Sequence, residues 1–171
     1  RDLIRAKMDE IVVHTCMLLD GSEMNLPEER KKWGMKTKFR VLQRDFAELS
    51  SGKKVIEYEE VVVGSNTMTF EEYINLRILA FIIFVTNQGI VFDAIQKLLR
   101  EQDIDVFELY YGMLTNKKNS SGKTQKVIEQ FKQATIDELW DSPQELLENF
   151  QKDSEYKKLL DGEAGTNVIY H

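Results

Sequence analysis

The feature of this 171-residue sequence that most constrains its fold is a nearly unbroken apolar and β-branched run at residues 11–19. The run reads Ile-Val-Val-His-Thr-Cys-Met-Leu-Leu, and it is followed by Asp20-Gly21, a pair typical of turns. This pattern predicts a β-strand that is buried on both faces and ends at that turn. Such a strand belongs in the middle of a sheet. Because the chain begins with Arg rather than Met, we expect most of the partner strands in sequence that precedes residue 1.

The rest of residues 1–66 predicts mixed α and β structure. A short charged helix is expected after Pro27, where a proline fits the first helical turn. Residues 37–42 and 54–63 are rich in β-forming side chains, and Ser50-Ser51-Gly52 lies between them. We therefore predict that these two segments pair as an antiparallel hairpin.

From residue 67 onward the apolar spacing becomes helical. Thr69 and Glu72 form a capping box, which predicts a helix from about residue 70 to 88. Asp105 and Ser142 are further N-cap candidates, and Asp153 is expected to cap a last short helix that ends at Gly162. The other expected helices cover residues 91–102, 106–114 and 124–140, and one begins at Pro143.

The predicted fold class is therefore α+β: a few strands followed by a mostly α-helical bundle of about five helices. We expect the chain to divide into a strand-containing region at residues 1–66, a helical domain at residues 67–162 and a loose tail at residues 163–171. The composition, with 42% hydrophobic and 30% charged residues, is that of an ordinary globular protein.

Charge and residue counts exclude several classes of function. Of 23 basic and 29 acidic residues, 12 of each lie in residues 1–65, so the acidic excess of 6 falls in residues 66–171 and argues against a general nucleic-acid binder. The longest apolar run, residues 78–85, is too short to cross a membrane, and we expect a cytoplasmic protein. One cysteine and two histidines exclude an internal disulfide, a classical zinc site and an iron–sulfur cluster ligated wholly by this chain. We predict no catalytic residue and no metal ligand within it.

Four residues are candidates for ligand contacts: Glu23, Asn25, Arg40 and Arg44. Glu23 and Asn25 follow the predicted buried strand, and ligands often bind at the carboxyl ends of such strands. Arg40 and Arg44 lie four apart in an extended segment and could together bind a carboxylate or phosphate. They belong to a stretch from Arg30 to Arg44 with seven cations and no acid, for which a solvated basic face is the simpler interpretation.

The order of several short segments resembles the C-terminal portion of radical SAM proteins that carry an N-terminal cobalamin-binding domain. The resemblance covers roughly residues 5–85. It depends on four segments, which are residues 11–19, Asp20-Gly21-Ser22-Glu23-Met24-Asn25, Thr37 to Phe46, and Glu59 to Tyr73. If it holds, residues 11–19 are a late strand of a partial (β/α) barrel, and residues 20–25 are the loop at its carboxyl end, near the S-adenosylmethionine site. Glu23, Asn25, Arg40 and Arg44 are then expected to contact substrate.

The resemblance implies a [4Fe-4S] cluster, S-adenosylmethionine and cobalamin for the full-length enzyme, but none of them for this portion of it. The family's Cys-x3-Cys-x2-Cys motif is absent from the sequence. The chain is thus expected to be an accessory or capping region that covers the substrate side of the barrel, binds the rest of the enzyme and is inactive alone.

The alternative is a non-catalytic α+β module that binds a partner protein or dimerises. Exposed strand edges invite pairing with a second copy, so a homodimer is compatible with both interpretations.

Overall fold

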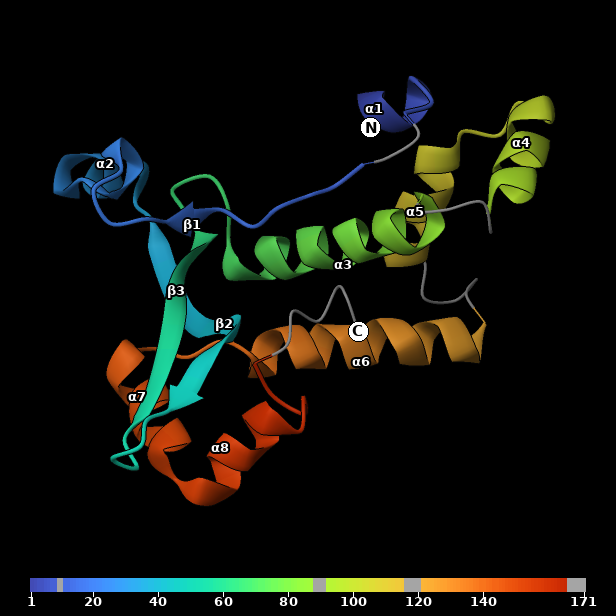
Figure 1. The fold of residues 1–171 in the computed structure, drawn as a ribbon. Coiled ribbons are helices and arrows are strands. Elements are labelled where there is room, and N and C mark those ends of the chain that lie inside the picture. Colours follow the sequence, from blue (N-terminus) through green and yellow to red (C-terminus); the bar gives the residue numbers. More distant parts are fainter. Residues whose placement is uncertain (9–10, 88–91, 116–120, 166–171) are drawn as a thin grey trace. The chain divides into compact units, whose positions relative to one another are not determined.

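The computed structural model describes residues 1–8, 11–87, 92–115 and 121–165. Within these residues the chain is α+β, with eight α-helices, one short 3₁₀ helix and three β-strands (Figure 1). It divides into two compact units, each made of two separate stretches of sequence. Unit 1 comprises Arg1–His14 and Ile74–Lys132, and unit 2 comprises Thr15–Tyr73 and Gln133–His171.

Unit 2 is built on a three-stranded antiparallel sheet with the strand order β1-β3-β2. The strands are β1 (Met17–Leu18), β2 (Lys36–Glu48) and β3 (Lys54–Gly64). The turn between β2 and β3 is closed by the Leu49 amide, which donates to the Lys53 carbonyl at 2.9 Å. The hairpin predicted from the sequence is therefore confirmed.

A large bulge interrupts the hairpin in the middle of β2. Val41 is paired with Tyr58 and Phe46 with Ile56, so residues 42–45 of β2 lie opposite the single residue Glu57. Within the bulge Arg44 has a φ of +66°, in the left-handed region that non-glycine residues rarely adopt. Because β2 is an edge strand, this irregular segment also breaks the row of backbone groups that another strand would need for pairing.

The helices of unit 2 are η1 (Glu23–Asn25), α2 (Pro27–Trp33), α7 (Pro143–Gln151) and α8 (Asp153–Leu160). Two of them, α2 and α7, begin at the prolines that the sequence marks as starts. The predicted cap of α7 is confirmed, since the Ser142 hydroxyl accepts from the Glu145 amide at 3.2 Å. α2 ends at Gly34, whose left-handed backbone is the usual helix terminator.

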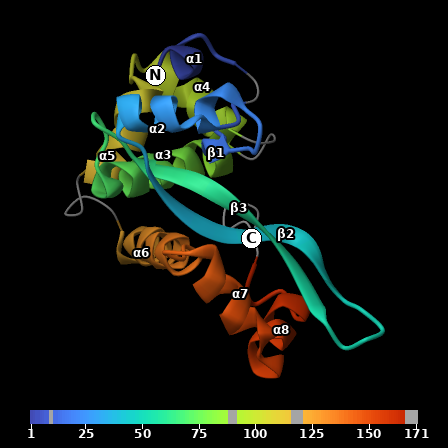
Figure 2. The same ribbon diagram turned by 90° about the vertical axis from the view of Figure 1, so that its left-hand side faces the viewer.

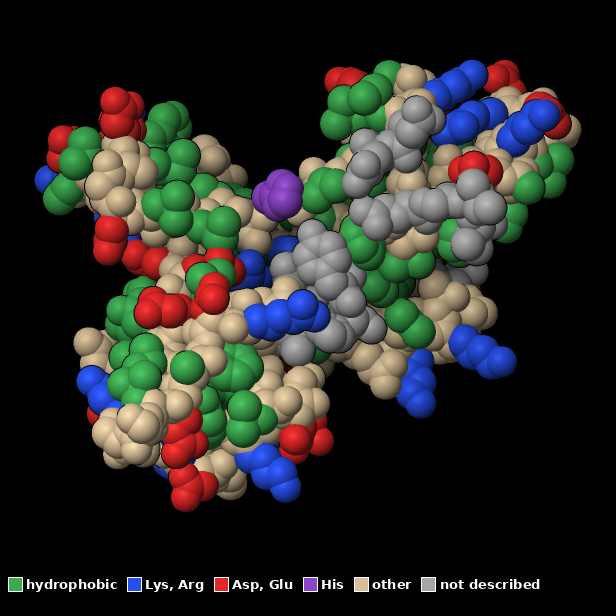
Figure 3. Space-filling view, in the orientation of Figure 1, with side chains coloured by type: hydrophobic (Ala, Val, Ile, Leu, Met, Phe, Trp, Pro, Cys, Tyr) green, Lys and Arg blue, Asp and Glu red, His purple; other side chains and the backbone are tan. Residues whose placement is uncertain are grey.

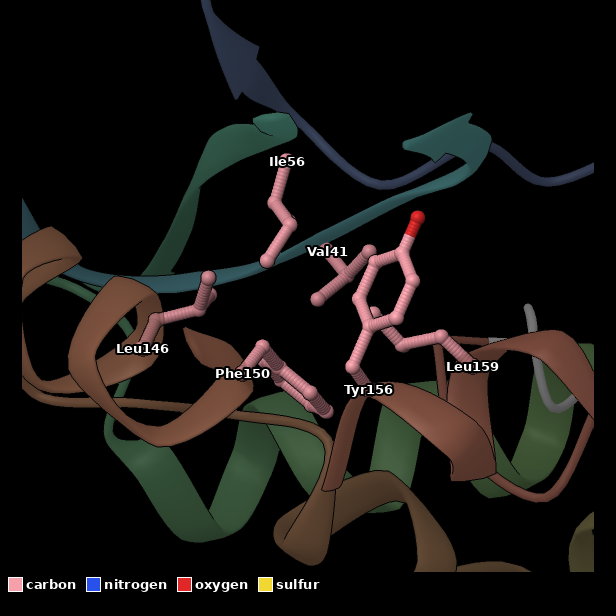
Figure 4. Close-up of a cluster of buried hydrophobic side chains, with 6 residues drawn as sticks. All are labelled: Val41, Ile56, Leu146, Phe150, Tyr156 and Leu159. Atoms are coloured by element: carbon pink, nitrogen blue, oxygen red, sulfur yellow. The ribbon is translucent and has the colours of Figure 1, made fainter. Parts of the chain in front are cut away.

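The core of unit 2 lies between the hairpin and the helices α7 and α8. Figure 4 shows the side chains of Val41 and Ile56 from the hairpin facing those of Leu146, Phe150, Tyr156 and Leu159 from the two helices. Figure 2 shows the same hairpin edge-on, strongly twisted, with α7 and α8 following one another below it. Burial of these apolar side chains is the main stabilising contribution to the unit.

The buried Lys54 links the turn end of the hairpin to α7 and α8. The Lys54 ammonium donates to the Gln151 carbonyl at 2.8 Å and pairs with the Asp153 carboxylate, while the Gln151 amide returns a hydrogen bond to the Lys54 carbonyl at 3.2 Å. Asp153 was predicted to cap the last helix. Its carboxylate instead pairs with Lys54, and Lys152 is the N-cap residue of α8.

The described residues of unit 1 are mainly helical. It contains α1 (Asp2–Arg5), α4 (Asp93–Glu101), α5 (Val106–Thr115) and most of α3 (Phe70–Asn87) and α6 (Gly122–Asp137). The capping box of α3 is confirmed, because the Thr69 amide donates to the Glu72 carboxylate at 2.7 Å and the Glu72 amide donates to the Thr69 hydroxyl at 3.2 Å. Asp105 caps α5 as predicted, accepting from the Phe107 amide at 2.9 Å.

Packing in unit 1 combines a ring stack with a buried amide network. The rings of Phe81 in α3 and Phe131 in α6 stack with their centroids 4.3 Å apart. The buried Gln96 amide of α4 donates to the Thr86 carbonyl of α3 at 2.7 Å and to the Tyr110 hydroxyl of α5 at 3.1 Å. These contacts hold the successive helices together.

The prediction of a doubly buried strand at residues 11–19 is wrong for this structure. Only Met17 and Leu18 form a strand, and β1 pairs with β3 alone at the edge of the sheet. Ile11 and Leu18 are buried, but Val12, Val13 and Leu19 are exposed. The physical reason is that a strand is buried on both faces only when other elements pack on each face of its sheet, and the described residues leave Val12, Val13, Met17 and Leu19 exposed.

The helical region also departs from the predicted single bundle. α7 and α8 pack against the hairpin in unit 2, whereas α4 and α5 belong to unit 1. The partial barrel is not confirmed, because the sheet in the described residues is small, open and antiparallel.

The division into domains at residues 1–66, 67–162 and 163–171 stays a prediction. Of the predicted loose tail, residues 166–171 lie outside the described residues.

Among the described helices, none combines the length and the apolar character that crossing a membrane requires.

The packing of α7 generates a stability prediction. Leu146 is fully buried in the core, so Leu146→Ala should lower the free energy of unfolding by about 2–5 kcal/mol in urea denaturation. The matched control is Leu160→Ala on α8, where the leucine is exposed and the loss should stay within about 0.5 kcal/mol. Equal losses for the two variants would contradict the described core.

Candidate functional site

The loop after β1 carries two of the four predicted ligand residues, and its polar groups mostly bind one another. The Asn25 side-chain amide donates to the Leu19 carbonyl at 3.2 Å, and the Ser22 hydroxyl donates to the same carbonyl at 2.7 Å. The Asn25 side-chain oxygen accepts from Arg30 at 2.8 Å. Glu23 begins η1 and is exposed. Asn25 therefore shapes the loop, whereas the carboxylate of Glu23 faces solvent.

Arg40, the third predicted residue, lies at the centre of a buried ion cluster. Its guanidinium binds the Glu59 carboxylate through Nε and the Glu138 carboxylate through Nη1, the latter at 3.0 Å. Its Nη2 donates to the Thr15 hydroxyl at 3.2 Å. The side chains of Arg40, Glu59 and Glu138 are only 8%, 12% and 11% exposed. The Arg40 guanidinium, which was expected to bind a ligand, is thus largely occupied by partners within the protein.

The electrostatic balance of this cluster favours the charged form of Arg40. Burial by itself lowers the pKa of the Arg40 guanidinium, but the charges and hydrogen bonds of Glu138 and Glu59 outweigh it and raise the pKa above its usual value. We call Arg40, Glu59 and Glu138 the Arg40 ion cluster.

Arg44, the fourth predicted residue, is exposed in the bulge of β2. The sequence reasoning assumed a regular strand, in which residues four apart share a face. The bulge and the left-handed backbone at Arg44 interrupt that regularity, and Arg40 is buried while Arg44 is not. The four predicted residues thus occupy different environments: Glu23 and Asn25 in the loop after β1, Arg40 in the ion cluster and Arg44 in the bulge.

A cavity of about 460 Å³ opens beside the Arg40 ion cluster, entirely within unit 2. Its apolar walls include Val41 of β2, Phe150 of α7 and Trp140, which lies between α6 and α7. The Trp140 and Phe150 rings meet edge to face with centroids 5.9 Å apart. Trp140 is held by its backbone, which exchanges hydrogen bonds of 2.9 and 2.7 Å with Phe39 of β2. The volume is in the range of small-molecule sites.

The charged lining of the cavity is mainly acidic. Its six charged side chains are Arg40, Asp137, Glu138, Glu155, Lys158 and Glu163. The Lys158 ammonium binds the Glu155 carboxylate at 2.9 Å, and this hydrogen bond lowers the pKa of the Glu155 carboxyl. Asp137 accepts from the Gln133 amide at 2.7 Å. Four acidic and two basic groups give the lining a formal charge of −2.

Of the four predicted residues, Arg40 alone is among those that line this cavity. Sequence reasoning missed the others because they come from β2, α6, α7 and α8, which are far apart in the chain. No local motif marks Trp140, Asn149 or Glu163. The only signal was the apolar spacing that predicted the helices on which several of them lie.

The cofactors implied by the resemblance do not find their ligands here. A radical SAM cluster is held by three cysteine thiolates, and the sequence contains Cys16 alone. Among the described residues, no group of three or more His, Cys, Asp and Glu side chains is arranged to hold a metal ion. No chemical step through such a group is derived for this chain.

Compared with known proteins, the sequence matches no family model and no curated protein.

The ion cluster makes a prediction about stability. Replacing Arg40 by Met removes the cation that the buried Glu59 and Glu138 carboxylates share, so Arg40→Met should destabilise the protein by about 3–5 kcal/mol at pH 7.

The control for this experiment is Arg44→Met, which removes the same charge from an exposed position in the same strand. We expect a change within about 0.5 kcal/mol by urea denaturation. If the two variants lose the same stability, the described cluster is wrong.

Proposed function

We propose that this chain is the C-terminal accessory region of a cobalamin-type radical SAM enzyme, in which it covers the substrate side of the barrel and is inactive alone. The [4Fe-4S] cluster, S-adenosylmethionine and cobalamin belong in this proposal to the barrel and the cobalamin domain of the longer, cytoplasmic enzyme. The reaction is performed there, and this chain contributes binding surface.

The observation that carries the proposal is an exposed apolar strip along β1 and η1. We define the strip as Cys16, Met17, Leu19, Met24 and Leu26, all of them exposed and all in unit 2. Leu19 is 62% and Met24 48% exposed, and the sulfur atoms of Cys16 and Met24 lie 3.4 Å apart. Figure 3 shows hydrophobic side chains on the surface of the region of unit 2 that carries β1 and α2. Exposed apolar side chains grouped on an edge strand and the turn that follows it are typical of a region that another element covers.

The position of β1 in the sheet supports the same proposal. Only two residues of the run at 11–19 pair with β3, although the whole run has the composition of a buried strand. Additional strands on the open side of β1 would extend the sheet, and elements packed on the face of the extended sheet would cover Met17 and Leu19. We propose that in the complete enzyme residues 11–19 become a late strand of the partial barrel.

The family resemblance adds support because of where its segments lie. The last residues of the first segment form β1, the second forms the loop and η1, the third lies in β2, and the fourth runs from β3 into α3. Apart from residues 11–14, all of them belong to unit 2. Segments that resemble one family in sequence order thus form one folded piece.

The predicted substrate contacts take different roles within this proposal. Glu23 and Arg44 are exposed and can reach a substrate directly. Asn25 and Arg40 are held by hydrogen bonds inside unit 2, so we assign them a positioning role for the loop and for the hairpin.

The exposed strip also supports a second candidate, a non-catalytic α+β module that dimerises or binds a partner protein through this face. β1 is an edge strand, and an edge with exposed apolar residues favours pairing with another chain. The two candidates differ in what covers the strip.

The gene that encodes the chain distinguishes them. The enzyme proposal expects the same reading frame to continue upstream of Arg1 and to encode Cys-x3-Cys-x2-Cys. A start codon directly before Arg1 would contradict it. In that case sedimentation of the chain should show a dimer that Leu19→Ser disrupts.

A variant of the complete enzyme provides the functional prediction. Met17→Ser combined with Leu19→Ser should weaken the attachment of this region and lower turnover at least fivefold, because the strip no longer buries apolar surface. Leu160→Ser on α8 removes an equally exposed leucine outside the strip and should leave turnover unchanged. Unchanged turnover for the strip variant would contradict the proposal that the strip is covered by the barrel.

A further inference from the structure

We propose that the cavity beside the Arg40 ion cluster is a binding site for a small organic cation with an apolar body, such as an alkyl or arylalkyl amine. This inference is independent of the proposed function, because every residue that it uses lies in unit 2 of the chain itself.

The sign of the ligand charge follows from the charged lining. Arg40 and Lys158 are each bound to carboxylates of the same protein, so neither is a ready partner for an anion. Asp137 and Glu163 are exposed carboxylates, and the described contacts pair neither of them with a lysine or arginine. A cation that enters the cavity gains two acidic partners and displaces no existing ion pair.

The bonding of Arg40 strengthens this preference. Its guanidinium lines the cavity, but it is bound to Glu59 and Glu138 and donates to the Thr15 hydroxyl. A carboxylate or phosphate ligand, as first expected at Arg40, is therefore disfavoured, because it would have to displace partners that Arg40 already has.

The apolar portion of the ligand is specified by the walls. Trp140, Phe150 and Val41 form a hydrophobic surface next to the acidic rim. Aromatic faces attract cations in addition to burying hydrocarbon, and tryptophan does so most strongly. The backbone bonds between Trp140 and Phe39 fix the chain at this wall, so the site is largely formed before a ligand arrives.

Tryptophan fluorescence gives a direct test, because the sequence has only Trp33 and Trp140. In a Trp33→Phe background the remaining signal reports on the cavity wall. We would titrate this protein with 4-phenylbutylamine and with 4-phenylbutyrate, which have similar shapes and opposite charges at neutral pH. The amine should bind at least tenfold more tightly, and its binding should weaken with added salt. Equal or tighter binding of the carboxylate would overturn the proposal.

Charge-removing variants locate the site. Asp137→Asn combined with Glu163→Gln should weaken amine binding at least fivefold. Glu28→Gln combined with Glu48→Gln removes two exposed carboxylates outside the cavity and should leave it unchanged. Equal effects of the two double variants would show general charge attraction and contradict the site. Thermal unfolding of each variant checks that the fold is retained.

A final arm distinguishes a free amine from a lysine side chain of another protein. A short blocked peptide with a central lysine is titrated under the same conditions. Weaker binding of the peptide than of 4-phenylbutylamine is the expected result. Peptide binding that is tenfold tighter would overturn the assignment to a small molecule.

Discussion

The contact on which the rest of unit 2 depends is the buried pairing of Arg40 with Glu59 and Glu138. It joins β2 to its neighbour β3 and to the residue that follows α6, which lies 98 positions later in the chain. Two residues beyond Glu138, Trp140 forms a backbone bridge with Phe39, next to Arg40 in β2. The chain is therefore attached to the hairpin just before α7 begins, and α7 and α8 can place their apolar faces on Val41 and Ile56.

Such a buried cluster is a weak source of net stability, because the removal of three charged groups from water costs about as much as their attraction returns. Its importance lies in specificity. A hairpin that slipped by one residue would separate Arg40 from Glu59 and leave buried charges without partners. The same cluster binds the guanidinium that lines the adjoining cavity, so Arg40 is not available to an anion there.

The sequence predicted the features that depend on local signals. Thr69 with Glu72, Asp105 and Ser142 are N-caps whose hydrogen bonds involve residues two or three positions away, and all of them are found in the structure. The β2–β3 hairpin is likewise local. The features that were missed require knowledge of distant partners. Residues 11–19 have the composition of a buried strand, but whether a strand is buried depends on which other elements pack against it, and composition does not reveal these. Likewise, the packing of α7 on the hairpin rather than on other helices depends on the contacts of Arg40 and Phe39 with the residues just before α7.

Unit 2 buries Leu146, Phe150, Tyr156 and Leu159 of α7 and α8 against the hairpin, although Leu160 of α8 is exposed. Near this core the Arg40 ion cluster is paired. At β1, by contrast, the strip formed by Cys16, Met17, Leu19, Met24 and Leu26 places five exposed apolar side chains on an edge strand and the turn that follows it. This grouping is the physical basis for the proposal that the chain acts as a covering region of a larger enzyme.

Hydrogen–deuterium exchange, compared between the chain alone and the complete enzyme, tests this claim most directly. The account predicts that backbone amides of residues 15–19 and 23–26 exchange at least tenfold more slowly in the complete enzyme, while those of α7 and α8 exchange at similar rates in both. Identical exchange at residues 15–19 and 23–26 in the two proteins would contradict it.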